Sequence, residues 1–134
     1  MKLQILTPEK TAFDGEAESV LAPGEAGVFE VLKDHAPILS SLVPGDLRVL
    51  TGGKPRYFHV SHGFLEFSKN RCSVLADAVE RPGEIVAERA QAAKERAYKR
   101  LERAAEVDLL RAQKALVRAL SREKFVRKFP GGLG

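Results

Sequence analysis

The sequence has only one cysteine, Cys72, in 134 residues, and it lacks any long apolar run. One cysteine excludes an internal disulfide and is typical of a reducing compartment. Its neighbours Val74 and Ala76 predict that Cys72 is a small buried side chain and not a reactive thiol. No window approaches the roughly 18 apolar residues of a membrane-spanning helix. The segment before Pro8 has one lysine and a short apolar patch, which is not the pattern of a signal peptide.

The common motifs of nucleotide-binding and hydrolytic enzymes are also missing. The sequence has no Gly-x-x-x-x-Gly-Lys loop, no Gly-x-Gly-x-x-Gly and no Gly-x-Ser-x-Gly. His59 and His62 are three apart in a predicted strand, so we expect them to face opposite ways and not to share a metal. Acidic residues are plentiful, but no two are singled out as a hydrolytic pair. The residues alone therefore do not indicate an enzyme.

Charge divides the chain into two parts. Residues 81–134 carry 14 Lys and Arg against 7 Asp and Glu, whereas residues 1–80 carry 8 against 11. The overall composition, 44% hydrophobic and 30% charged, is that of a globular protein. Because the division coincides with a change in sequence pattern, we expect two parts with different roles.

Up to about residue 80 the chain consists of short apolar runs separated by turn signals. The runs are rich in Val, Leu, Ile and Phe, and Asp-Gly, Pro-Gly and Gly-Gly pairs separate them. This pattern predicts an antiparallel sandwich or barrel. Alternation within one run predicts that Leu47 and Val49 face the core while Asp46 and Arg48 face water.

From Glu84 the sequence has the composition of two helices. The run EIVAERAQAAKERAYKRLERA contains no Gly or Pro, and Pro82-Gly83 marks its start. A second run, VDLLRAQKALVRALSREKFVRK, should end before Pro130. The polar stretch 105–108 between them predicts a reversal, and hence two antiparallel helices.

The apolar faces of these two predicted helices are narrow and rich in alanine. Burial of alanine contributes little at about 25 cal/mol per Å². We therefore expect a hairpin that closes on itself but docks only weakly on its neighbour, so that it can detach. The residues of the two faces are Val86, Ala90, Ala93, Ala97 and Leu101 in the first helix, and Leu109, Ala112, Leu116 and Leu120 in the second.

The basic residues of the hairpin leave three interpretations open. They form a solvated surface, or they bind nucleic acid or an anionic membrane, or they contact an acidic protein or a nucleotide. Two arginine rows on facing helices would suit a polyphosphate, because each guanidinium makes charge-assisted hydrogen bonds. The rows are Arg89 and Arg96 on the first helix and Arg111, Arg118 and Arg122 on the second.

Asp34 and His35 stand side by side just ahead of Pro37, between two apolar runs. An adjacent acid and imidazole raise the hypothesis of a small hydrolase. No nucleophile accompanies them, however, and side chains of sequence neighbours tend to diverge. The alternatives are a polar loop corner or a contact point for another protein.

Four stretches then occur in a recognisable order: LQILTPEKTAFDGEAESVLAPGEAG, HAPILSSLVPGDLRV, VSHGFLEFSKNRCSVLADAVER and the Ala/Arg-rich hairpin. In this order the chain resembles the epsilon subunit of rotary F-type ATP synthases along nearly its whole length. The resemblance implies an α+β fold, with an N-terminal antiparallel β-sandwich of about ten strands in residues 1–81 and a C-terminal two-helix antiparallel hairpin in residues 82–134. Ile38, Leu39 and Leu42 would then belong to the sandwich core.

The resemblance also implies a non-catalytic rotor subunit of the central stalk, with ATP made on the beta subunits. Its sandwich would bind the gamma subunit and the c-subunit ring, with Asp34 and His35 facing one of them, and would couple proton-driven rotation to ATP synthesis. Its place would be peripheral, at the cytoplasmic face of a bacterial inner membrane or the organellar equivalent.

For the hairpin, the resemblance implies inhibition of ATP hydrolysis when it extends into the alpha/beta catalytic head. Residues of the second helix would then meet acidic segments of the beta subunits, and we assign this contact to Arg111, Lys114, Arg118 and Arg122. The competing hypothesis is a stand-alone β-domain module that binds nucleic acid or anionic membrane through its basic helices, whereas the resemblance implies no nucleic-acid partner.

The resemblance implies no required cofactor, but it offers ATP as a regulatory ligand of the folded hairpin. The family motif Ile/Leu-Asp-x-x-Arg-Ala is matched by Ile85, Arg89 and Ala90, whereas Val86 replaces the Asp. Loss of that carboxylate removes a contact worth roughly 1–3 kcal/mol, or about ten- to a hundredfold in affinity. The other positions that match the nucleotide site are Glu80, Arg96, Arg118 and Arg122.

Overall fold

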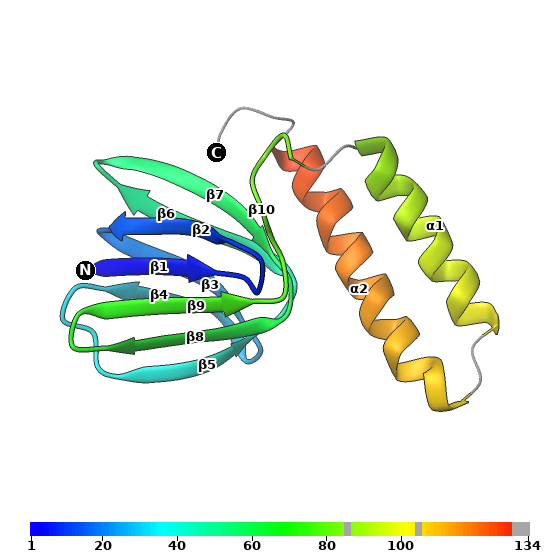
Figure 1. Cartoon of the computed structure of the whole chain (residues 1–134), viewed down its shortest axis with the longest axis horizontal. Helices are drawn as coiled ribbons and strands as arrows, with labels where there is room; N and C mark the ends of the chain where they lie inside the picture. Colours follow the sequence, from blue (N-terminus) through cyan, green and yellow to red (C-terminus); the bar gives the residue numbers. More distant parts are fainter. Residues whose placement is uncertain (85–86, 104–105, 130–134) are drawn as a thin grey trace.

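The computed structural model describes residues 1–84, 87–103 and 106–129 (Figure 1). Ten strands are followed by two helices, which confirms the predicted fold class. The helices are α1 (Ala87–Arg103) and α2 (Glu106–Lys128). The strands are β1 (Lys2–Leu6), β2 (Thr11–Glu16), β3 (Ser19–Gly24), β4 (Gly27–Leu32), β5 (Ile38–Leu42), β6 (Gly45–Thr51), β7 (Lys54–Val60), β8 (Gly63–Ser68), β9 (Arg71–Ala76) and β10 (Val79–Glu80).

The strands form two layers that are joined at one narrow point. One layer has the order β10-β7-β6-β3, with β4 on the other edge of β3, and the second has the order β5-β8-β9-β1-β2. A single register pair between β3 and β5, Gly24 with Leu42, connects them. All neighbouring strands are antiparallel except β1 and β9, which run parallel.

The space between the two layers is filled by apolar side chains. Leu47 and Val49 are fully buried, as alternation predicts, whereas Asp46 and Arg48 are partly exposed. Cys72 is buried as well, and burial raises the pKa of its thiol to about 12. The prediction that Cys72 is a buried side chain and not a reactive thiol is therefore confirmed, because a thiol with so high a pKa stays protonated and unreactive at neutral pH.

One predicted core residue lies on the outside of the sandwich. Leu42 is buried and Ile38 packs against the core, but the side chain of Leu39 is 70% exposed, so its prediction was wrong. The reason is the two-residue period of a strand, which sends neighbours to opposite faces. Ile38 lies opposite the buried Phe67, whereas Leu39 lies opposite the exposed Glu66 on the outer face.

The helices form an antiparallel hairpin beside one end of the sandwich, opposite the end that holds the N-terminus (Figure 1). Ala90 and Ala97 of α1 are buried against α2, as predicted, and Ala112 and Ala119 of α2 are buried too. Ala93, Leu101 and Leu116 are half-buried, and Val86 lies outside the described residues. Leu109 and Leu120 are 36% and 39% exposed, so their placement on the inner face was wrong.

The apolar stripe of α2 is thus rotated from the predicted one. The buried alanines of this stripe, Ala112 and Ala119, are seven apart, and Leu120 lies one position further round the helix. Small side chains on this stripe let the two helices approach closely. Among the described helices, neither combines the length and apolarity needed to cross a membrane.

Gly63, the first residue of β8, provides a test of the strand packing. A Cβ atom at this position would lie 2.1 Å from the Leu75 carbonyl oxygen and 2.7 Å from the Ala76 Cα atom, both backbone atoms of β9. We expect Gly63→Ala to lower the free energy of unfolding by about 1–3 kcal/mol, since the two strands must separate. Chemical denaturation measures this change.

Gly15→Ala in β2 is the matched control, because its Cβ would meet only the Phe13 ring, at 3.6 Å. We expect this variant to unfold within about 0.5 kcal/mol of the parent. Equal stability of the two variants would contradict the close approach of β8 to β9 at Gly63.

Candidate functional site

The last turns of α2 attach the hairpin to the sandwich through a cluster of aromatic rings. Phe125 is fully buried and packs with Ala90 of α1, and with Tyr57 and Phe129. Its ring centroid lies 5.0 Å from that of Phe129 and 5.6 Å from that of His59 in β7. Tyr57, also in β7, stacks on Phe129 with centroids 4.3 Å apart. One helix end thus supplies the apolar contact between the two halves of the chain.

Polar contacts surround this aromatic cluster. Arg122 donates two hydrogen bonds to the Glu80 carboxylate of β10, at 2.8 and 2.9 Å. Lys128 donates to Asp46 of β6 at 2.9 Å. The Ser121 hydroxyl lies 2.7 Å from Nε2 of His59, whose side chain is fully buried. Two acids of the sandwich and two bases of α2 therefore pair across the contact.

A further ion pair ties the two helices together near the same end. The Lys94 ammonium of α1 lies 2.7 Å from the Glu123 carboxylate of α2, and Arg127 also pairs with Glu123. Hydrogen bonds from Lys94 and Arg127 hold the pKa of Glu123 below its usual range. The carboxylate therefore stays ionised at neutral pH and links the hairpin across its interface.

The expectation that the hairpin docks weakly through alanine was wrong about the docking residues. Alanines hold α1 against α2, but the sandwich is contacted by Phe125, Phe129 and the charged residues around them. The sequence carried a signal for this contact. Phe125 and Phe129 are four apart in the last turns of a helix that is otherwise basic and rich in alanine, and such a pair lies on one face.

Four arginines gather around a small cavity between the two helices. The cavity has a volume of about 180 Å³, and alanines form its floor. Alanine side chains are too short to fill this space, so the longer guanidinium groups line its rim. The arginines are Arg96 and Arg100 on α1 and Arg118 and Arg122 on α2, and the alanines are Ala93, Ala97, Ala115 and Ala119.

The electrostatics of this arginine cavity favour an anion. Among the described residues, no acidic side chain lines this cavity, and Arg122 is paired with Glu80 from outside it. A second hollow of about 420 Å³ lies on the other side of Arg118 and Arg122, against the sandwich, where Glu80 and Lys10 line it. Like charges held this close attract an oxyanion with several oxygens, such as a phosphate chain.

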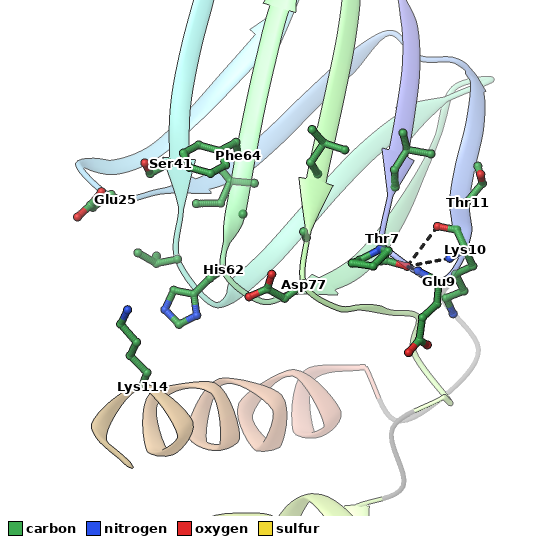
Figure 2. Close-up of a pocket in the computed structure, with 17 residues that line it drawn as sticks. Thr7, Glu9, Lys10, Thr11, Glu25, Ser41, His62, Phe64, Asp77 and Lys114 are labelled. Atoms are coloured by element: carbon green, nitrogen blue, oxygen red, sulfur yellow. Dashed lines mark hydrogen bonds between the residues drawn. The ribbon is translucent and has the colours of Figure 1, made fainter. Parts of the chain in front are cut away.

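The remaining predicted contact residues of α2 lie apart from the arginine cavity. Arg111 is exposed. Lys114 is exposed too, and it points toward His62 across a cleft of about 960 Å³ at the end of the sandwich (Figure 2). Glu25 and Asp77 line the sandwich side of this cleft. Lys114 thus faces acidic residues that belong to its own chain.

Asp34 and His35 lie at the opposite end of the sandwich and do not face each other. Asp34 exchanges two hydrogen bonds with Asn70, and its backbone has a φ of 66°. The His35 ring packs edge-on against Phe67, and its Nδ1 lies 2.6 Å from the Ala36 carbonyl oxygen. Each side chain is therefore held by a different partner, which fits the loop-corner interpretation and not an acid–base pair.

Three exposed apolar side chains form a strip on the outer face of the second layer. Phe64 of β8 lies directly opposite Leu75 of β9, and it is diagonal to Leu39 of β5. Their side chains are 54%, 53% and 70% exposed. We call Leu39, Phe64 and Leu75 the apolar strip; side chains this large and contiguous on a surface are typical of a protein contact.

The histidines are separated as their spacing predicts. His59 points to the buried contact with α2, whereas His62 lines the open cleft. Across the described ranges, no three residues of the types His, Cys, Asp and Glu are placed to hold a metal ion.

With this geometry in view, the chain can be compared with known proteins. The family model of the β-sandwich domain of the ATP synthase delta/epsilon chain matches residues 1–82. The ATP synthase epsilon chain of Desulforamulus reducens is 46% identical over 92% of this chain and 94% of its own. The chain belongs to the ATP synthase epsilon-chain family. Its members are subunits of that enzyme complex, and the resemblance noted in the sequence is confirmed.

A further epsilon chain agrees with this assignment, and two solved structures contain a chain of similar fold. The epsilon chain of Nitratidesulfovibrio vulgaris is 45% identical over 91% of this chain and 92% of its own. A chain of the Euglena gracilis mitochondrial ATP synthase, in a structure of OSCP, F1 and c-ring, matches with a TM-score of 0.80 at 21% identity, over 92% of this chain and 79% of that one. The central stalk and c-ring structure of Tetrahymena thermophila ATP synthase contains a chain that matches with a TM-score of 0.54 at 16% identity, over 96% of this chain and 92% of that one. At such identities the structures show a shared fold.

The positions matching the epsilon-chain nucleotide motif are only partly assembled in the described residues. Arg96, Arg118 and Arg122 line the arginine cavity, and Glu80 binds Arg122. Ala90 packs under Phe125, and Arg89 is exposed and does not line the cavity. Ile85 and Val86 lie outside the described residues. The cavity also includes Arg100, which sequence reasoning missed although it lies four residues after Arg96 on the same face.

Proposed function

We propose that the chain is a non-catalytic rotor subunit of a proton-translocating F-type ATP synthase, which couples rotation of the c-subunit ring to ATP synthesis on the beta subunits. The observation that carries this proposal is the match to epsilon chains over more than nine-tenths of the sequence. As part of that complex it would lie peripherally, at the cytoplasmic face of a bacterial inner membrane or its organellar equivalent.

The surface of the sandwich offers two contacts for the rotor. The apolar strip of Leu39, Phe64 and Leu75 suits the gamma subunit, because burying exposed apolar area stabilises a permanent interface. The end of the sandwich that holds Asp34 and His35 suits the c ring or a neighbouring part of gamma. This end lies away from the hairpin, so its contact does not depend on docking (Figure 1). Phe64 and Leu75 of the apolar strip, by contrast, line the cleft that Lys114 of α2 also lines.

The hairpin would regulate ATP hydrolysis by leaving the sandwich and extending toward the alpha/beta head. Arg111 and Lys114 are already exposed, whereas Arg122 is held by Glu80 until α2 undocks. Release would present these residues and Arg118 together to acidic segments of beta. The support is the opposite sign of the charges and the small contact area at one end of α2.

ATP is the proposed regulatory ligand of the docked hairpin, and no cofactor is needed for the rotor role. The arginine cavity would hold the phosphate chain, since it brings four guanidinium groups together and, among the described residues, no carboxylate lines it. A nucleotide bound there would bridge α1 and α2 and so favour the closed hairpin.

Assembly with gamma tests the rotor role. A charge in the apolar strip must be desolvated at the interface, so Phe64→Glu should weaken binding to gamma by about 2 kcal/mol or more, roughly thirtyfold. Val28→Glu is the matched control, because Val28 is 70% exposed on β4, outside the apolar strip. Titration calorimetry with purified gamma measures both variants. Failure of the parent chain to bind gamma, with salt-sensitive binding to nucleic acid instead, would favour the stand-alone module.

ATP hydrolysis by the assembled complex tests the regulatory role. We expect a complex whose subunit ends at residue 81 to hydrolyse ATP several-fold faster than one with the whole chain, because the inhibitory contact is gone. In the whole chain, Arg111→Glu and Lys114→Glu should each give the same direction of change, and Lys99→Glu on the exposed face of α1 serves as a charge-matched control for either single variant. An unchanged rate after truncation would contradict inhibition by the hairpin.

Calorimetric titration of the isolated chain with Mg-ATP tests the nucleotide site. Arg96→Ala and Arg118→Ala should each weaken binding about ten- to a hundredfold, since a hydrogen bond to a charged group contributes roughly 1.5–3 kcal/mol. Lys124→Ala removes an exposed cation of α2 that does not line the cavity, and we expect it to bind like the parent. No heat at millimolar Mg-ATP would exclude the site.

A further inference from the structure

His59 is a buried histidine in the contact between the sandwich and the hairpin. Its side chain is 1% exposed at the end of β7. On the hairpin side it meets the Ser121 hydroxyl at 2.7 Å and the Phe125 ring, whose centroid lies 5.6 Å from its own. Both neighbours belong to α2, so the imidazole is covered only while the hairpin is docked.

Charged groups face His59 from each element packed around it. Glu80 of β10 and Asp46 of β6 are its register partners on the two neighbouring strands. Arg122 of α2 pairs with Glu80, and Lys128 of α2 pairs with Asp46. Arg118 of α2 and Lys10, Asp77, Glu84 and Glu9 of the sandwich side line the adjoining hollow with His59. Docking thus supplies Glu80 and Asp46, the two register partners of His59, with a cation each.

The docked environment keeps the imidazole neutral. Burial lowers the pKa of His59 to about 4; the carboxylates of Glu80 and Asp46 oppose this shift, and the Arg122 guanidinium adds to it. After release, water reaches the ring, and both carboxylates lose their α2 partners. The pKa of the imidazole then returns to at least its ordinary value of about 6.5.

We propose that His59 makes docking of the hairpin depend on proton concentration, so that acidification releases α2 from the sandwich. The inference rests on the proposed regulatory role of the hairpin and names a signal that sets its position. The sign follows from the proton counts: the released state binds a proton that the docked state excludes. The contribution of His59 to docking is therefore complete above about pH 6.5 and declines as the pH falls toward 4.

The size of the pH effect on docking follows from the two pKa values of His59, about 4 in the docked state and about 6.5 in the released state. Between about pH 7.5 and about pH 5.5, the ratio of released to docked hairpin should rise about tenfold, because the released state gains the proton over this range.

Energy transfer between two dyes measures docking in the whole chain. The dyes are attached to cysteines placed at Lys54, the first residue of β7, and at Gln113 on α2, which are both exposed positions. The native Cys72 is buried and has a raised pKa, so it stays unlabelled. We expect the tenfold rise at constant ionic strength in the parent chain. His59→Gln keeps a hydrogen-bonding side chain without the titration and should change less than about twofold over the same range.

His35 is the matched control, because it lies at the far end of the sandwich, away from α2. His35→Gln makes the same substitution there and should keep the pH dependence of the parent chain. An equal pH dependence in His59→Gln and the parent, or none in the parent, would overturn the proposal.

Proton NMR of the ring provides a second measurement that does not require His59→Gln to dock. In the parent chain the His59 ring should stay neutral down to about pH 5, whereas in Phe125→Ala, which loses the docking side chain, it should titrate near about 6.5 or above. Titration at the same pH in both chains would also overturn it.

These outcomes are distinguishable from failure of the proposed function. A docking ratio that is flat with pH, together with faster hydrolysis after truncation, would remove the proton dependence and leave the regulatory role intact. A docking ratio that follows pH, together with no effect of truncation on hydrolysis, would keep the proton dependence of docking and remove the regulatory role.

Discussion

The contact between the end of α2 and the sandwich determines what the rest of the molecule does. The two alanine-lined helices hold each other, but their attachment to the sandwich depends on Phe125 and its ring of charges. Full burial of one such side chain is worth about 1.5–3 kcal/mol, and a partly exposed ion pair about 0–1 kcal/mol. A contact of this size holds the hairpin closed yet leaves release within reach of a ligand or a partner surface.

Charge is distributed along the sandwich so that the hairpin has a preferred end. Residues 1–80 have a net negative charge, but the charged side chains are unevenly distributed. Acids gather at the end beside the hairpin, and bases gather at the far end. A basic hairpin is therefore attracted to one end and repelled from the other. The acids beside the hairpin are Glu9, Glu25, Asp46, Asp77 and Glu80, and the bases of the far end are Lys2, Lys33, Lys69 and Arg71.

Local patterns predicted the type of structure in each half well and the long-range contacts poorly. Turn pairs indicated an antiparallel β half and alternation placed Leu47 and Val49 correctly, whereas the number of strands came only from the resemblance. Residues 38 and 42 of β5 point to one face of the sheet and residue 39 to the other, so alternation alone would have excluded Leu39 from the core. The alternation was hard to see because Leu39 is itself apolar. The parallel pairing of β1 with β9 joins segments about seventy residues apart, and no short-range signal encodes it. Likewise, the spacing of the arginines along each helix predicted the two arginine rows. The ion pair between Arg122 and Glu80 could not be predicted in this way, because it depends on how the hairpin docks on the sandwich.

Arg122 connects the proposed roles, because one guanidinium serves three acidic partners in turn. In the docked chain it binds Glu80, and it also lines the arginine cavity where a phosphate chain would lie. Both of these contacts need the closed hairpin, so nucleotide binding and docking should strengthen each other by thermodynamic linkage. A carboxylate of beta, by contrast, would reach Arg122 only after the proposed release, and it would compete with the other two. Protonation of His59 acts on the same competition from the sandwich side, since it disfavours the one state in which Glu80 and Arg122 are paired.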